Sequence, residues 1–164
     1  MMRLVPAFNT NRMVSEYVER FYYPAALRSR QFLEGDLRRV KNLVAWKRFV
    51  AQHWSEVRIE VLEQSSRNDL HVGEEVPVRV KVRLGALKPD QVSVELYHGP
   101  ATVDREVRSG SATALKVGGE DNGSWWYEGV VSCAESGLYG YAVRVRPVHE
   151  DALVPNEMSL IAWY

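Results

Sequence analysis

Three consecutive aromatic residues, Trp125, Trp126 and Tyr127, are the side chains of this sequence best suited to binding a ligand. Flat aromatic faces stack on sugar rings, so an exposed pair at the edge of a sheet would suit a carbohydrate. Neighbouring residues of a strand point to opposite sides of the sheet, which places Trp125 and Tyr127 on one side and Trp126 on the other. One side must be the core, so core packing explains at least one of the three. Tyr97 and His98, at the end of another predicted strand, could extend such a platform.

The other residue types that often carry chemistry form no recognisable site. No histidine has another His or a Cys at the spacing of a zinc site. Gly118-Gly119 is followed by neither the lysine nor the helix start that a phosphate-binding loop needs, and no serine lies in a nucleophile-elbow motif. The sequence therefore predicts no catalytic, cofactor-binding or metal-ligating residue. The four histidines are scattered over a predicted helix end, turns and loops: His53, His71, His98 and His149.

The charge balance argues against several classes of partner. The 21 basic and 21 acidic side chains give a formal net charge of zero, without the basic excess of nucleic-acid or membrane-surface proteins. No apolar run approaches the roughly 18–20 residues of a membrane span, and the N-terminus has no signal-peptide pattern. The single cysteine, Cys133, permits no internal disulfide and suits a reducing compartment. We expect a cytoplasmic protein with no nucleic-acid or membrane partner, in which Cys133 is structural.

Two amphipathic helices are predicted in the first third of the chain. The first begins near Asn11, and Pro24 predicts a kink or break in it. Gly35 suits a C-terminal cap and Asp36 an N-terminal cap. The second helix follows over residues 37–54. Apolar side chains recur on both at three- and four-residue spacing, so the two helices are expected to pair as a hairpin.

These helices carry more aromatic side chains than a hairpin can hide. A third surface has to cover the remainder, because an exposed apolar patch of this size commonly marks an interaction site. For the isolated chain this predicts self-association, which includes exchange of the first helix between copies as one route. The expected interaction face consists of Tyr17, Phe21, Tyr22, Trp46 and Trp54.

From Val57 onward, apolar residues alternate with polar ones. The run Val57, Ile59, Val61 is followed by the clearest strand, residues 76–84, which has an apolar residue at every second position. Asn122-Gly123 is a typical hairpin turn. Further strands are expected over residues 92–96, 112–117, 124–131, 137–146 and 157–163. About seven short strands separated by turns fit an immunoglobulin-like antiparallel β-sandwich. The predicted class is α+β, with a helical segment over residues 1–56 and the sandwich over residues 57–164.

The start of the chain also resembles a known family. Residues 8–26 read FNTNRMVSEYVERFYYPAA, with a polar cap, Arg-Met-Val, a polar pair, Tyr-Val-Glu-Arg and an aromatic pair. This run resembles the closing helix of the α-glucan (glycogen, starch, maltodextrin) phosphorylases, in the branch whose chains continue past that helix. Residues 43–59, LVAWKRFVAQHWSEVRI, and residues 137–141, GLYGY, resemble the same branch. The resemblance covers essentially the whole chain.

The resemblance implies that this chain is only the end of an enzyme. In that family the catalytic core is hundreds of residues long, binds pyridoxal phosphate through a lysine, and cleaves terminal α-1,4-glucosyl units with phosphate to give glucose 1-phosphate. Such a core would lie before Met1. The chain would then be a non-catalytic C-terminal region of a glycosyltransferase, with the catalytic body as its partner and pyridoxal phosphate in the parent enzyme alone.

Three functions remain compatible with these observations. The first, which we favour, is packing, assembly or substrate positioning within a phosphorylase-like enzyme. The second is a stand-alone carbohydrate-binding module for α-glucan, because similar sandwiches accompany many glucan-active enzymes. The third is an oligomerisation domain without a ligand.

Overall fold

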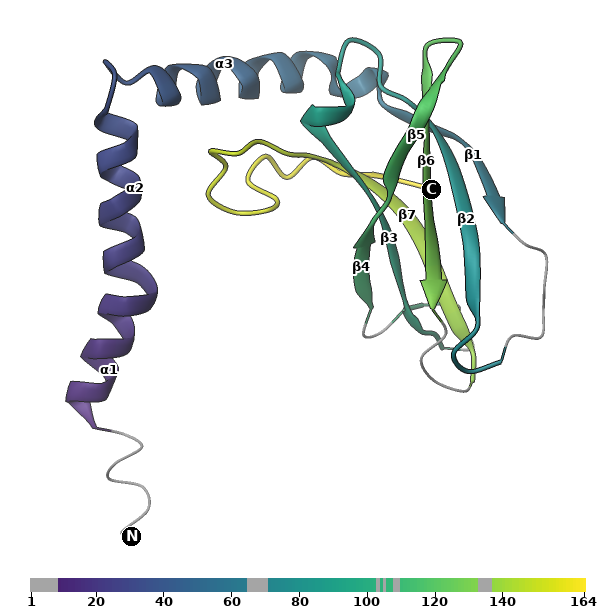
Figure 1. The fold of residues 1–164 in the computed structure, drawn as a ribbon, viewed down its shortest axis with the longest axis horizontal. Helices are drawn as coiled ribbons and strands as arrows, with labels where there is room; N and C mark the ends of the chain where they lie inside the picture. Colours follow the sequence, from purple (N-terminus) through teal and green to yellow (C-terminus); the bar gives the residue numbers. More distant parts are fainter. Residues whose placement is uncertain (1–8, 65–70, 103, 105, 108–109, 133–136) are drawn as a thin grey trace, which may run out of the picture. The chain divides into compact units, whose positions relative to one another are not determined.

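The computed structural model describes residues 9–64, 71–102, 104, 106–107, 110–132 and 137–164 (Figure 1). The chain divides into two compact units, residues 1–46 and residues 47–164, and helix α3 (Arg38–His53) contributes to both. The predictions made for Cys133 and for the first eight residues lie outside the described residues.

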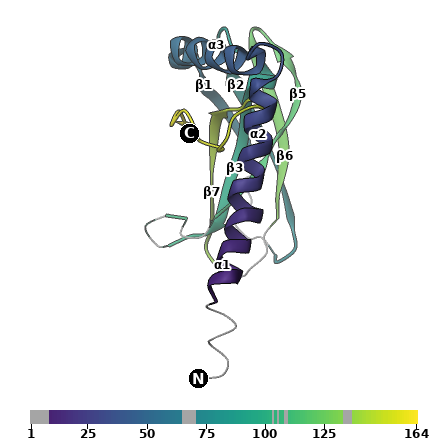
Figure 2. The same ribbon diagram turned by 90° about the vertical axis from the view of Figure 1, so that its left-hand side faces the viewer.

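The first unit begins with one long helical run (Figure 2). It comprises α1 (Thr10–Tyr17), the π-helical segment η1 (Val18–Tyr22) and α2 (Tyr23–Leu33). The side-chain oxygen of Asn9 accepts a hydrogen bond of 2.7 Å from the backbone N–H of Asn11. This bond satisfies one of the free donors at the helix start, which lies close to the predicted position.

The predicted kink near Pro24 takes the form of a widened turn. Proline has no N–H to donate to the preceding turn of a helix. The π-helical segment η1 comes just before it, and there the N–H of Tyr23 bonds to the carbonyl oxygen of Val18, five residues back. Tyr22 and Tyr23 keep right-handed helical angles, so the helix is widened rather than broken.

A left-handed turn joins α2 to α3. Gly35, Asp36 and Leu37 have φ angles of 59°, 57° and 59°. Gly35 follows the C-cap residue Glu34, as expected for a helix-ending glycine. The prediction that Asp36 is an N-cap is wrong, because Asp36 is itself left-handed and its carboxylate instead accepts a 2.8 Å hydrogen bond from Lys41.

The predicted helical hairpin is also wrong. None of the described side chains of α1, η1 and α2 is buried, whereas paired helices would bury the facing stripe of each. The first buried residue along the described chain is Leu43 in α3. The prediction of an apolar stripe on these helices is correct, but the prediction that the second helix covers this stripe is wrong.

The second unit holds two antiparallel sheets, so the α+β class and the two-sheet architecture are confirmed. The described residues form eight strands rather than the expected seven. The first sheet has the order β1 (Arg58–Gln64), β2 (Glu75–Arg83), β6 (Ser124–Ser132), β5 (Lys116–Asp121). The second sheet has the order β4 (Ser111–Ala114), β3 (Val92–Pro100), β7 (Tyr139–Pro147), β8 (Ala162–Trp163). Short 3₁₀ turns, η2 (Trp54–Glu56) and η3 (Pro89–Gln91), precede β1 and β3.

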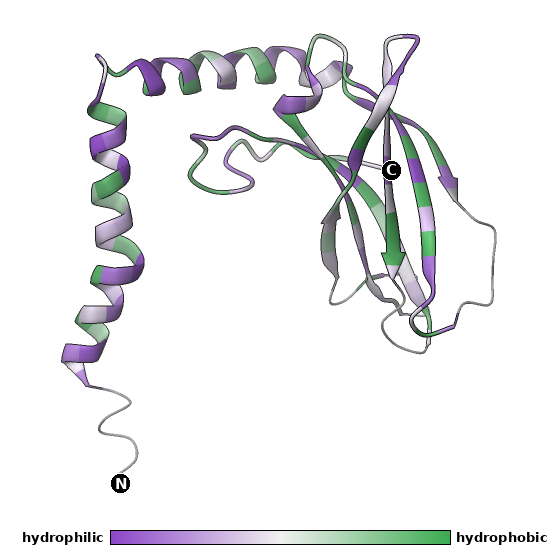
Figure 3. Cartoon of the chain, viewed as in Figure 1, coloured by the Kyte–Doolittle hydropathy of each residue, from purple (hydrophilic) through white to green (hydrophobic). Residues whose placement is uncertain are grey.

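The core of this unit follows the predicted alternation. Every second residue of β2 is buried, and Figure 3 shows the corresponding change of hydropathy along the strand. The core side chains of β2, β3, β6 and β7 include Val78, Val80, Val82, Val94, Leu96, Tyr127, Val143 and Val145. The turn at Asn122-Gly123 between β5 and β6 is confirmed, because both residues have positive φ, 53° and 80°, as in a type I′ hairpin.

The end of α3 is fixed to this unit. Val50 is fully buried, and the ammonium group of Lys47 pairs with the carboxylate of Glu157. After the helix, Glu56 accepts a 3.0 Å hydrogen bond from the backbone N–H of Ala86. This contact requires Gly85, because a Cβ atom at that position would lie 2.2 Å from the carboxylate of Glu56.

Three predicted strands differ from the observed ones, and the strand expected over residues 157–163 is reduced to β8. The run predicted over residues 112–117 is divided at Leu115, whose N–H bonds to the carbonyl oxygen of Val94 at 2.8 Å. The chain passes there from the second sheet into the first, with the Leu115 side chain buried against Gly129. In β1, the register shifts between Ile59 and Val61, so Val61 is 39% exposed instead of facing the core. The pairing of β5 with β6 has a similar shift between Val117 and Gly119.

Candidate functional site

Strand β6 carries the predicted aromatic triplet, and its residues alternate between the two sides as expected. Tyr127 lies in the core with 2% of its surface exposed, and Trp125 on the same side is half-buried. Burial raises the pKa of Tyr127 to about 12, and its hydroxyl has no hydrogen-bond partner among the described residues. Tyr127 is therefore a core residue rather than a surface for stacking a sugar.

Trp126 faces outward but is already engaged by cations. The guanidinium carbon of Arg79 lies 4.1 Å from the centre of its ring, and the Lys81 ammonium lies 5.6 Å away. Lys81 also donates a 2.7 Å hydrogen bond to Asp121, and this bond, with a further one from Trp126, holds the pKa of the Asp121 carboxyl below its usual value. A sugar ring would have to displace Arg79 to stack on that face.

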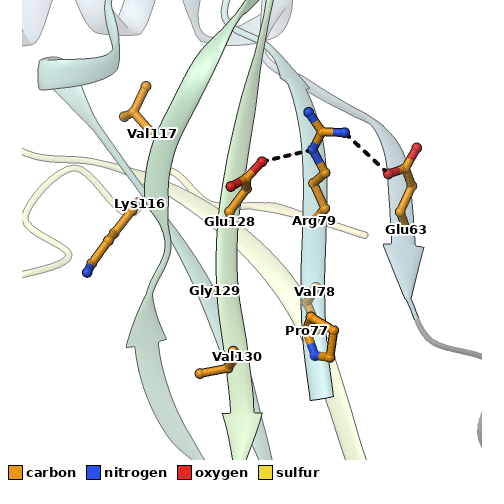
Figure 4. A pocket seen from close by; sticks show the side chains of 9 residues that line it. All are labelled: Glu63, Pro77, Val78, Arg79, Lys116, Val117, Glu128, Gly129 and Val130. Atoms are coloured by element: carbon orange, nitrogen blue, oxygen red, sulfur yellow. Dashed lines mark ion pairs between the residues drawn. The ribbon is translucent and has the colours of Figure 1, made fainter. Parts of the chain in front are cut away.

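A shallow groove next to Trp126, about 650 Å³ in volume, crosses the outer face of the first sheet (Figure 4). Arg79 spans it, at 3.0 Å from Glu128 and 3.8 Å from Glu63, and the Lys116 side chain points away from these groups. The carboxylates in the groove are thus paired with a cation. The remaining lining residues are Pro77, Val78, Val117, Gly129 and Val130.

The predicted interaction face is divided by the structure. Tyr17, Phe21 and Tyr22 are between 48% and 65% exposed, and Tyr17 lies 5.7 Å from Phe21 and 6.5 Å from Tyr22 between ring centres. Trp46 is buried and Trp54 is half-buried, so these two do not belong to an exposed surface. We define the helical face as the exposed large apolar side chains of α1, η1 and α2: Met13, Val14, Tyr17, Val18, Phe21, Tyr22, Tyr23, Leu27 and Leu33.

Tyr97 and His98 lie on β3 of the second sheet, whereas the aromatic triplet lies on β6 of the first sheet. His98 faces the interior, where its ring nitrogens lie 2.8 Å from the Tyr139 hydroxyl and 3.0 Å from that of Thr113. Tyr139 of β7 thus contacts the neighbouring strand β3. Tyr97 faces outward on β3, so neither residue extends the platform on β6.

A buried ion cluster lies on the outer side of the second sheet. Glu95 accepts hydrogen bonds of 2.8 Å from Arg144 and 2.6 Å from Arg146, and one of 3.0 Å from Ser93. Burial raises the pKa of the Glu95 carboxyl, but these hydrogen bonds together outweigh burial and leave the pKa below its usual value. The Arg144 guanidinium also lies 5.4 Å and 5.7 Å from the ring centres of Tyr97 and Trp163.

The comparisons with known proteins agree with the resemblance noted in the sequence. Residues 54–164 match the family model described as the glycogen phosphorylase C-terminal domain. The chain belongs to this family. It is 29% identical over 164 residues to the maltodextrin phosphorylase of Thermococcus litoralis, and the match covers 98% of this chain but 19% of that protein.

A second relative gives a similar picture. The chain is 26% identical over 160 residues to the glycogen phosphorylase of Mycobacterium tuberculosis, in a match that covers 96% of this chain and 18% of the relative. The chain therefore spans about a fifth of the length of the curated relatives it matches. No solved structure matches it.

The resemblance implies that pyridoxal phosphate is bound by the parent enzyme and not by this chain, and the described lysines have other surroundings. Lys41, Lys47 and Lys81 are each paired with a carboxylate, while Lys88 and Lys116 are exposed.

Within the described part of the chain, no group of three or more His, Cys, Asp or Glu side chains could hold a metal ion. No helix of the described residues is long and apolar enough to cross a membrane.

Sequence reasoning missed the pair formed by Tyr97 and Trp163. Their ring centres lie 6.2 Å apart at 82° on the outer face of the second sheet. A signal was present in the residues around them: the outward positions of β3 and β7 nearby are Gly99, Gly140 and Ala142. Small residues let another segment approach the sheet closely, and a Cβ atom on Gly140 would lie 3.1 Å from the Cβ of Ala101 and 3.2 Å from the Cγ2 of Val107.

Proposed function

We propose that this chain is the non-catalytic C-terminal region of an α-glucan phosphorylase, and that the helical face docks on the catalytic body of the parent enzyme. The observation that carries the proposal is that the helical face is exposed over three consecutive elements. Helices in proteins owe most of their stability to the packing of an apolar face. A helical run that buries none of its described side chains therefore needs a covering surface from outside the described residues, which the catalytic body would supply.

The rest of the chain would connect the helices that carry the helical face to the two sheets, which we call the β-domain. The second half of α3 is anchored by Val50 and by the pair between Lys47 and Glu157. We propose the domain boundary at residues 56 and 57, where η2 ends and the strands begin. In the absence of the catalytic body, the helical face of one copy would cover that of another, which gives self-association of the isolated chain.

An immunoglobulin-like topology for the β-domain is part of the proposal. In such domains one sheet has the strand order A-B-E-D and the other contains C-F-G. The first sheet, with the order β1-β2-β6-β5, corresponds to A-B-E-D, and the strands β3-β7-β8 of the second sheet correspond to C-F-G.

The names of the relatives support the parent activity. They are a maltodextrin phosphorylase and a glycogen phosphorylase. The parent of this chain would accordingly be a cytoplasmic glycosyltransferase that cleaves α-1,4-glucan with phosphate to glucose 1-phosphate, and pyridoxal phosphate would be bound by its catalytic body.

The first test is the size of the native protein in its source cells, measured with an antibody against this chain. The proposal expects a band several times larger than 18.8 kDa, because the relatives are about five times longer. A band near 18.8 kDa would overturn it.

The second test addresses docking directly. The chain is co-expressed with the separate catalytic polypeptide, and the two are expected to co-purify. Substitution of Phe21 and Tyr22 by Asp in the helical face should abolish co-purification. The matched control is Val130→Asp in the β-domain, at a side chain that is also exposed, at 45%, and it should leave co-purification intact. Equal effects of the two changes would contradict docking through the helical face.

A further inference from the structure

A concave region of about 740 Å³ lies on the outer face of the second sheet, and of the residues suggested by the sequence for a sugar platform only Tyr97 lines it. We name it the aromatic groove. It is bordered by β8 and by the chain after β3: Tyr97, Ala101, Glu106, Val107, Leu138, Tyr139, Gly140, Tyr141, Ala142 and Trp163 line it. Its volume lies within the roughly 300–1,000 Å³ typical of small-molecule sites.

The floor of the aromatic groove is flat because its outward positions are small. On β7 these are Gly140 and Ala142, and Gly140 pairs with Gly99 of β3 while Ala142 pairs with Tyr97. The neighbouring turn approaches the floor closely, since a Cβ atom on Gly140 would lie 3.1 Å from the Cβ of Ala101. Tyr97 is thus the large side chain of the floor.

The rings of Tyr97 and Trp163 form a corner above this floor. They are nearly perpendicular, at 82°, and 53% of the Trp163 surface is exposed. The Arg144 guanidinium lies over both rings at 5.4 Å and 5.7 Å from their centres, farther than the 4.1 Å of Arg79 over Trp126, and Glu95 accepts a hydrogen bond of 2.8 Å from it. The two rings are therefore held in place before any ligand arrives, which reduces the entropy lost on binding.

The chemistry of the aromatic groove favours a neutral ligand with hydroxyl groups. The aromatic faces suit the C–H face of a pyranose ring, while the exposed carboxylate of Glu106 can accept hydrogen bonds from hydroxyls. Arg144 shares the Glu95 carboxylate with Arg146 and does not line the groove, and the described lining residues include no lysine or arginine that would bind a phosphate. We propose that the aromatic groove binds a segment of α-1,4-glucan chain, with Trp163 and Tyr97 as its stacking residues. The choice of glucan among sugars rests on the proposed function.

The test is calorimetric titration of the whole 164-residue chain with maltoheptaose, and measurable binding is expected. Trp163→Ala should weaken it about tenfold, the loss expected for one stacked ring. Ala142→Gln, which fills the floor without removing a ring, should weaken it as well. The matched control is Trp126→Ala on the first sheet, which should leave the affinity unchanged. Circular dichroism establishes that each variant is folded.

The outcomes separate this inference from the proposed function. Absence of maltoheptaose binding, an unchanged affinity in both groove variants, or an equal loss in Trp126→Ala overturns the aromatic groove as a glucan site. Competition by inorganic phosphate would also overturn it, because the ligand would then be an anion. Glucan binding without co-purification of the catalytic polypeptide would refute docking alone, and co-purification without glucan binding would refute the groove alone.

Discussion

Apolar residues follow a regular period in both units, but they are buried in the second unit and exposed in the helical run of the first. In β2 the alternating valines from Val76 to Val82 are all buried, whereas the aromatic residues at helical spacing in α1 and η1 lie in solvent. The β-domain pairs two such faces, one from each sheet, within residues 47–164. The helical run has one apolar face and no second face in the described first unit. The difference shows that amphipathic periodicity predicts that a surface will be covered, without saying by which polypeptide.

The largest effect in this comparison is expected when a large side chain in each unit is replaced by alanine. Leu96→Ala in the β-domain, at a fully buried position, should lower the free energy of unfolding by about 2–5 kcal/mol. Phe21→Ala in the helical face should change it by less than about 0.5 kcal/mol, because the side chain loses few contacts in the isolated chain. Urea unfolding followed by tryptophan fluorescence, at a concentration where the chain is monomeric, gives both values. A large cost for Phe21→Ala would mean that the helical face is buried within the chain.

Ion pairs offer a second comparison, with a smaller expected effect. Glu95→Gln leaves two arginines without their shared carboxylate, and the Glu95 side chain is 6% exposed while those of the arginines are 20% exposed. The loss should be about 2–3 kcal/mol, below the full cost of breaking a deeply buried pair. In the helical unit, Glu16 pairs with Arg12 at 3.5 Å in solvent, so Glu16→Gln should cost less than about 0.5 kcal/mol. Thermal unfolding of the two variants measures the difference.

The pH dependence of stability should come from the β-domain. Burial lowers the pKa of His98 from its usual 6.5, so the unfolded chain takes up a proton at this residue before the folded chain does. This contribution to stability is fully present above pH 6.5 and is lost as the pH falls toward the lower folded-state pKa. His98→Gln should flatten this decline in unfolding curves recorded between pH 7.5 and 5.5. An unchanged slope would mean that another group is responsible.

Glu95 should contribute to a second loss of folding stability at lower pH. The folded-state pKa of its carboxyl lies below the usual 4.5, so its contribution is present above pH 4.5 and is lost as the pH falls below that value. Glu95→Gln should reduce the loss of stability below pH 4.5, to which carboxyls such as that of Asp121 also contribute, and should leave the loss at higher pH in unfolding curves recorded from pH 7.5 to 3.

The smallest effect is expected from deletion of residues 1–37, which removes the helical face and leaves α3 intact. The free energy of unfolding of the β-domain should stay within about 0.5 kcal/mol of the full chain, because none of the described deleted side chains is buried. The same deletion should abolish co-purification with the catalytic polypeptide. A destabilised β-domain would instead indicate that the deleted residues are part of its structure.

Local rules predicted the strands better than the helices. The strand expected over residues 76–84 is β2, Glu75–Arg83, because alternation and burial are set within one segment. The division of the run 112–117 depended on Leu115 meeting Val94 and Gly129 from elsewhere in the chain, which no local pattern contains. The spacing of the apolar residues in the helical face likewise could not predict which surface covers it.

The candidate sites show the same limit. Alternation along β6 correctly placed Trp125 and Tyr127 opposite Trp126, but the cover of Trp126 by Arg79 depends on the pairing of β6 with β2. The small residues of β3 and β7 were a local signal for the aromatic groove. The contact between Trp163 and Tyr97 could not be predicted from them, because it arises only through the pairing of β8 with β7, where Trp163 lies opposite Arg144.

The register shifts in β1 and β5 have a consequence for how copies of this chain can meet. These two strands are the edges of the first sheet, and each is interrupted by its own irregularity. The edges of the second sheet are β4, four residues long, and β8, two residues long. Bulged or very short edge strands resist the addition of a further strand from another molecule. The described sheets are thus protected against edge-to-edge polymerisation, so association of the isolated chain should stop at small assemblies joined by side chains rather than grow into fibres.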